Sequence, residues 1–187
     1  YILSFQHFQG VDLHTLKSET AEHAPYLDAT NNDIPKSFVE ELLYWIHILE
    51  NPKEKVNWQL PIAVQTRTSF FEGHLILRLQ MSYLLFDRQQ AEHIIEQLKA
   101  YNSVFTINQP HYYFYKALWL FRFLDDTHHK KEQGALWKEI KYCIKQIEVF
   151  AKNSPQNFEH FLALLKALYY QHTKQTMKAQ LHFDRAI

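Results

Sequence analysis

The sequence predicts an all-α fold in which amphipathic helices are joined by short polar turns into antiparallel pairs. Glycine occurs only three times in 187 residues, whereas a β-sandwich or a barrel needs many glycines in its turns. Apolar residues make up 47% of the chain and recur at helical spacing, without strand-like alternation of useful length. Aromatic residues contribute 16%, which is too rich for a disordered chain.

Residues 1–60 carry the less regular part of this helical pattern. One helix is expected from Asp12, which can cap its start, to about Ala24, and Pro25 is expected to end it. Pro35 suits the first turn of the next helix, and Asn51-Pro52 is expected to stop that helix. Its apolar stripe has the spacing of one helix face and consists of Phe38, Leu42, Trp45, Ile46 and Leu49.

Residues 61–187 show a more regular alternation of helix, turn and helix. We expect helices at about residues 63–86, 91–98, 112–124, 131–152, 158–171 and from 175 onward. The prediction is therefore one helical-repeat domain over residues 1–187. Because the chain opens at Tyr1 without an initiator Met and stops at Ile187 within an apolar-periodic run, we expect it to be a fragment of a longer polypeptide.

The last predicted helix pair fits the spacing of a tetratricopeptide repeat. When the small residue of the second helix is placed at Ala179, that of the first helix is Ala167, followed by the aromatic Tyr170. The second helix then has its aromatic position at Phe183 and its last small position at Ala186. Two antiparallel helices can cross closely where alanines leave room, and the aromatic rings fill the space beside the crossing. The Trp and Leu that usually occur early in the first helix are absent, so the match is partial.

An earlier segment, about Leu75 to Tyr101, fits the same frame more loosely. Ala91 takes the small position, Ile95 the aromatic position and Leu98 the last position, while Leu79 replaces the small residue of the first helix. Together the two pairs predict a tetratricopeptide-like α-solenoid, an α-α superhelix of about four antiparallel pairs. An irregular helical bundle with accidental spacing is the alternative, and it is also all-α.

Three segments resemble a helical region of very large bacterial signalling proteins: Tyr112 to Leu118, Phe150 to His160 and Leu181 to Ile187. In that family Trp-Ala stands where this chain has Phe150-Ala151, and Ser154 replaces the family's usual Cys. These proteins join a serine/threonine-kinase-like domain, a predicted STAND-type ATPase, GAF or PAS sensors and often a histidine kinase.

The resemblance extends upstream to Leu75 through Lys99, where the family commonly has a Gly-Asp-Tyr turn and this chain has Phe86-Asp87-Arg88. It implies a non-catalytic protein-interaction and relay scaffold for signal transduction, whose partner is a protein or the flanking domains of the same chain. No kinase, nucleotide-binding or phospho-acceptor motif lies within these residues, so the family's enzymatic activities are not expected of this fragment.

Composition limits the other classes of partner. Twenty basic and twenty acidic residues leave no net charge to attract nucleic acid or an anionic membrane surface. No apolar run approaches the roughly 18–20 residues of a membrane span. The single cysteine, Cys143, excludes an internal disulfide and favours a reducing, cytoplasmic compartment, and its place on an apolar helix stripe predicts a buried, inert thiol.

No residue pattern predicts catalysis, a cofactor or a metal ion. His128-His129 point about 100° apart on a helix, so a solvated turn is favoured over a zinc site. Glu40-Glu41 and Asp125-Asp126 are interpreted as solvated faces or caps rather than acid–base pairs. Three scattered glycines provide no phosphate-binding loop. We therefore expect this fragment not to be an enzyme.

The densest aromatic cluster is expected on the helix that Pro110 opens. This run has more rings than one helix face can bury, which favours packing on two sides, as in a stacked solenoid. The functional alternative is a groove for a partner, whose candidate residues are Tyr112, Tyr113, Tyr115 and Trp119. A further alternative to the scaffold is a small-molecule sensor, with a pocket enclosed by the aromatic-rich helices.

Overall fold

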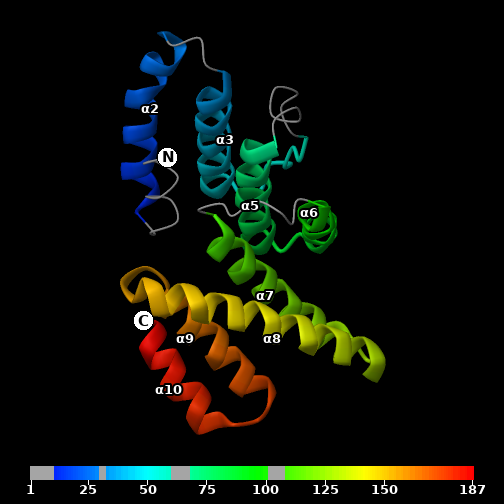
Figure 1. Cartoon of the computed structure of the whole chain (residues 1–187). Coiled ribbons are helices and arrows are strands. Elements are labelled where there is room, and N and C mark those ends of the chain that lie inside the picture. Colours follow the sequence, from blue (N-terminus) through cyan, green and yellow to red (C-terminus); the bar gives the residue numbers. More distant parts are fainter. Residues whose placement is uncertain (1–10, 30–32, 60–67, 101–107) are drawn as a thin grey trace. The chain divides into compact units, whose positions relative to one another are not determined.

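A computed structural model of the chain describes residues 11–29, 33–59, 68–100 and 108–187 (Figure 1). The described residues form eight α-helices and contain no β-strand, which confirms the all-α prediction. The chain divides into two compact units, Tyr1–Val104 and Phe105–Ile187. None of the helices in the described ranges has the length and apolar character needed to cross a membrane.

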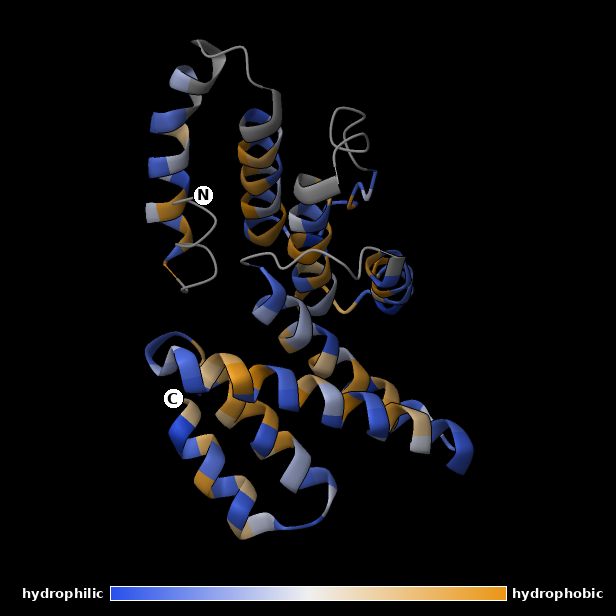
Figure 2. Cartoon of the chain, viewed as in Figure 1, coloured by the Kyte–Doolittle hydropathy of each residue, from blue (hydrophilic) through white to orange (hydrophobic). Residues whose placement is uncertain are grey.

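Unit 1 contains four described helices, each of which packs against the next: α2 (Leu13–Ala29), α3 (Asp33–Glu50), α5 (Thr68–Leu84) and α6 (Arg88–Ala100). Figure 2 shows hydrophobic residues concentrated along α3 and α5. The predicted stripe of α3 supplies most of the core because its period matches one helix face. Its fully buried members, Leu42, Trp45 and Ile46, lie in two clusters. Trp45 packs together with Ile48 against Leu77 and Met81, and Leu42 and Ile46 pack against Leu16.

The expected end of α2 at Pro25 is wrong, because the helix continues through this proline to Ala29. Proline fixes its own φ near −65°, a value that a helix accepts, although it removes one backbone donor and its ring crowds the carbonyl four residues earlier. The helix before it contributes little apolar surface, with Leu16 and Thr20 as its buried residues.

The described residues of unit 2 form four helices in sequence: α7 (Gln109–Asp126), α8 (Lys130–Asn153), α9 (Pro155–His172) and α10 (Thr176–Ala186). Pro110 and Pro155 occupy the first turns of α7 and α9, where a missing N–H group removes no helical hydrogen bond. Each helix packs against its successor, and α7 also contacts α9.

The α5–α6 and α9–α10 pairs are joined by the same backbone turn. Phe86 and Lys174, each two residues beyond the end of the first helix, have positive φ angles of 58° and 59°. The N–H of the following residue donates to the carbonyl five residues earlier, over 2.9 Å from Asp87 to Ser82 and 2.8 Å from Gln175 to Tyr170. These contacts define a Schellman motif, in which a left-handed residue satisfies the last carbonyls of a helix.

The shared turn is in register with the repeat spacing of the sequence. Ala91 and Ala179, the small positions of the two second helices, each lie five residues after the left-handed residue and are buried. Glycine adopts a positive φ without steric cost, but neither turn has a glycine at this position. The two hairpins are thus equivalent in turn and register, with non-glycine residues at both left-handed positions.

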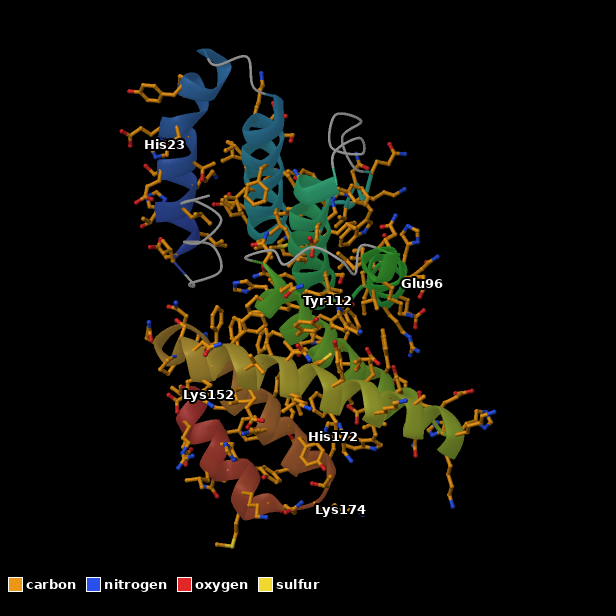
Figure 3. The ribbon with its side chains drawn as sticks, viewed as in Figure 1. His23, Glu96, Tyr112, Lys152, His172 and Lys174 are labelled. Carbon is orange, nitrogen blue, oxygen red and sulfur yellow. The ribbon has the colours of Figure 1, made fainter. Side chains whose placement is uncertain are left out.

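We expect Lys174→Gly to stabilise the α9–α10 hairpin, since Lys174 is exposed in the turn (Figure 3). A non-glycine residue in the left-handed conformation costs about 1–2 kcal/mol in steric strain. Glycine avoids this strain, but ordering its more flexible backbone on folding costs about 0.5–1 kcal/mol. The free energy of unfolding should therefore rise by about 0.5–1 kcal/mol. Amide hydrogen exchange of α10 should therefore slow.

Gln180→Gly is the matched control, because Gln180 is exposed within α10 and glycine weakens a helix interior by roughly 0.5–1 kcal/mol. Exchange should accelerate in this variant. If amide hydrogen exchange of α10 were faster in both variants, Lys174 would not have a left-handed conformation that glycine relieves.

Candidate functional site

The structure places the four predicted groove residues on α7 at different depths. Tyr112 and Trp119 are buried, whereas Tyr113 and Tyr115 are half-buried. The Tyr113 ring lies edge-on to Tyr142 of α8 at 5.9 Å, and Arg122 lies 5.2 Å from the ring centre of Trp119. The interpretation of these residues as a partner groove stays a prediction.

Two further aromatic side chains of α7, Phe114 and Phe121, pack against neighbouring helices. Phe114 stacks on Phe161 of α9 with ring centres 4.0 Å apart, and Phe121 lies between Trp137 of α8 and His172 of α9, at 6.3 Å and 5.1 Å. His172, labelled in Figure 3, also bonds Asp125 of α7 over 3.0 Å. Aromatic side chains of α7 therefore pack against both α8 and α9 within unit 2.

A buried lysine lies beside the only cysteine in unit 2. Lys116 of α7 donates to Glu139 of α8 over 2.5 Å, and its Nζ lies 5.4 Å from the ring centre of Tyr112. Burial acts to lower the pKa of Lys116, but Tyr112 and Glu139 outweigh it, so the pKa is raised and the ammonium stays charged. Burial raises the pKa of the Cys143 thiol to about 12, which leaves it protonated at neutral pH. Such a thiol is a poor nucleophile.

The predicted repeat-packing residues lie in the α9–α10 hairpin. Ala167 and Ala179 are buried, at 0% and 4% exposure, whereas Phe183 and Ala186 are half-buried. Tyr170 stacks on His182 of α10 with ring centres 5.3 Å apart. The frame assigned the ring position of α10 to Phe183, and the structure shows His182 in the ring contact with Tyr170.

We expect Ala179→Leu to destabilise the chain by about 1–3 kcal/mol, because the added atoms have no space in a close-packed helix contact. Ala135→Leu makes the same change at an exposed position of α8 and should be neutral within roughly 0.5 kcal/mol. The midpoint of urea-induced unfolding, compared at an unchanged m-value, gives the change in stability of each variant. Equal effects of the two substitutions would show that Ala179 is not at a tight contact.

Unit 1 contains a buried charge network that the sequence interpretation missed. Glu41 was interpreted as part of a solvated carboxylate pair, and this is wrong: Glu40 is exposed, but the Glu41 side chain is only 2% exposed. Its carboxylate accepts hydrogen bonds from His74 Nδ1, from Arg78 Nε and, over 3.1 Å, from Trp45 Nε1. Spacings of four residues, from 41 to 45 and from 74 to 78, were the available signal for polar groups sharing a face.

The network extends from the helices to residues 51–59. The two terminal nitrogens of Arg78 donate to the carbonyl oxygens of Trp58 and, over 3.2 Å, of Gln59. The Trp58 ring lies 5.0 Å from that of Trp45. Arg78 therefore holds this segment against α3 and α5 through main-chain contacts.

The charges of the network follow from burial. Burial lowers the pKa of Arg78 to about 10, although Tyr44 opposes this, so the guanidinium remains positive at pH 7 and pairs with Glu41. Burial lowers the pKa of His74 to about 4, and the Arg78 cation lowers it further. His74 is thus neutral and donates its Nδ1 proton to Glu41, while its Nε2 has no partner among the described residues.

A cavity of about 330 Å³ adjoins this network. Helix α5 lines it with Phe71, Leu75 and Arg78, and Trp58 lines it from residues 51–59. The lining from α6 consists of Gln90, His93, Ile94 and Gln97. The cavity therefore combines apolar surface with convergent polar groups, as small-molecule sites do.

Within the described ranges, no group of three or more His, Cys, Asp or Glu side chains is placed to hold a metal ion. His128 and His129 are exposed in the turn before α8. Comparison with protein-family models, with curated proteins and with solved structures gives no match. Inference about function therefore rests on the chain's own residues.

We expect unit 1 to lose stability as the pH falls from 6.5 to 4. In this window the unfolded chain takes up a proton at His74 before the folded chain does, because the pKa is about 4 when folded and 6.5 when unfolded. This difference corresponds to roughly 3 kcal/mol of unfolding free energy, fully present above pH 6.5.

His74→Asn should flatten this dependence, and His93→Asn is the control because His93 is exposed. Urea midpoints followed by tryptophan fluorescence at pH 7 and 4.5 provide the measurement. The same pH slope in the wild type and in His74→Asn would contradict a neutral, buried His74.

Proposed function

We propose that this chain is a non-catalytic, tetratricopeptide-like scaffold that binds a protein partner or a flanking domain. The observation that carries this proposal is the pair of equivalent hairpins, α5–α6 and α9–α10. Both have a left-handed residue at the turn and a buried alanine at the same place in the second helix. Repeated hairpins of this kind are the building units of solenoids, whose extended surfaces bind proteins.

Contacts between alternate helices support stacking of the pairs in unit 2. In a solenoid the first helix of one pair packs against the first helix of the next. Helices α7 and α9 are in contact in this way, through the Phe114–Phe161 stack. This contact favours a stacked array over two independent hairpins.

The terminal hairpin carries an apolar surface suited to a partner. Met177 and Leu181 lie one turn apart on α10 and are 88% and 51% exposed. Val149 of α8 is 52% exposed as well. Exposed apolar side chains at i and i+4 are the pattern by which one helix docks against another.

The proposed context is cytoplasmic signal transduction within a multidomain bacterial protein that has ATPase, sensor and histidine-kinase domains outside these residues. It comes from the resemblance of Tyr112–Leu118, Phe150–His160 and Leu181–Ile187 to that family. A mechanical relay role fits such a scaffold, because a partner bound to one pair changes the packing of the next. The protonated, buried Cys143 is consistent with a non-catalytic role.

Photo-crosslinking of the full-length protein tests this proposal. We expect a benzophenone residue in place of Leu181 to crosslink to a partner polypeptide or to another domain of the chain. The same residue in place of exposed Gln180, on a different face of α10, should crosslink much less. Met177→Glu should reduce the crosslink at position 181. Equal crosslinking from both positions, or none from 181, would refute the docking role of α10.

A further inference from the structure

We propose that the cavity between α5 and α6 binds a small aromatic carboxylate. This binding site lies in unit 1 and is separate from the docking surface on α10. The carboxylate of the ligand would pair with Arg78, and its flat ring would lie against the apolar lining. The amides of Gln90 and Gln97 would hydrogen-bond at the rim.

The two helices turn matching faces to the cavity. Phe71, Leu75 and Arg78 have i, i+4, i+7 spacing on α5, and Gln90, Ile94 and Gln97 have the same spacing on α6. Side chains at this spacing lie along one helix face. The cavity is therefore lined over two helical turns on each side, and its volume of about 330 Å³ lies at the small end of ligand pockets.

Arg78 is held in place before any ligand binds. Three of its five N–H groups are used, one each by Glu41, the Trp58 carbonyl and the Gln59 carbonyl. Two N–H groups, one on each terminal nitrogen, have no hydrogen-bond partner within the described part of the chain, and the guanidinium is positive at neutral pH. A carboxylate accepts two parallel hydrogen bonds from such a group, which makes this pairing specific.

The polarity of the lining favours an anion over a cation. Arg78 is positively charged, the two glutamines are neutral, and none of the lining residues is a carboxylate. Glu41 is buried and bonded to Nε of Arg78, so it fixes the guanidinium without itself lining the cavity. Trp58 and Phe71 supply flat apolar surface, which favours an aromatic body for the ligand.

Ligand-observed saturation-transfer NMR on the whole chain tests this site, with benzoate and naphthoate as probes. Benzamide and naphthamide have the same shape without the charge. We expect the carboxylates to bind about tenfold more tightly than the amides, because a hydrogen bond to a charged group is stronger than one to a neutral group.

Two isosteric substitutions on α6 separate the cavity from the surface. Gln97→Glu places a negative charge in the lining and should weaken carboxylate binding about tenfold or more through like-charge repulsion. Gln89→Glu makes the same change at an exposed residue outside the lining and should leave affinity unchanged. Ile94→Trp should abolish binding by filling the cavity, and circular dichroism checks that each variant is folded.

The proposal is overturned if neither carboxylate binds at millimolar concentration, if the amides bind as well as the acids, or if the two glutamate variants behave alike. None of these results would affect the crosslinking of α10. The failure of this site is thus distinguishable from the failure of the scaffold role.

Discussion

The helical hairpins of this chain depend on one local constraint, the reversal of direction between two helices that must remain in contact. A helix ends with carbonyls that lack partners, and a tight reversal leaves them close to the start of the next helix. The Schellman turns at Phe86 and Lys174 satisfy those carbonyls with the N–H groups that immediately follow. The next helix then begins in a direction that brings Ala91 or Ala179 against its neighbour. The left-handed residue thus allows the chain to reverse direction, and the small residue allows the two helices to pack closely after the reversal.

Unit 1 relies on a second kind of constraint, a salt bridge that is almost completely buried. A buried ion pair gains little stability over an apolar replacement, but losing one partner leaves a charge stranded in the core. Glu41, His74 and Arg78 avoid this cost because every charged group meets an opposite charge or a hydrogen-bonding partner. The network also fixes residues 51–59, the longest described segment without helical structure, through the carbonyls of Trp58 and Gln59.

Much of this fold was predictable from sequence because helix periodicity is a local property. The stripe of α3 and the burial of Cys143 follow from the spacing of apolar residues, and the start of α7 follows from Pro110, which suits a first helical turn. The end of α2 was not predictable, since Pro25 is compatible with either a stop or a continuation. The burial of Glu41 depends on α5, which is distant in sequence, so no local pattern distinguishes it from exposed Glu40. The cavity likewise arises from three segments that only tertiary packing brings together.

The shielding of Cys143 has a practical consequence for solution studies of this protein. With its sulfur wholly enclosed and protonated, the native chain presents no competing thiol to a maleimide or methanethiosulfonate reagent. A cysteine introduced on any surface helix becomes the sole attachment point for a spin label or a fluorophore. Pairs of such labels can therefore measure the spatial arrangement of the two units in solution without removing a native residue.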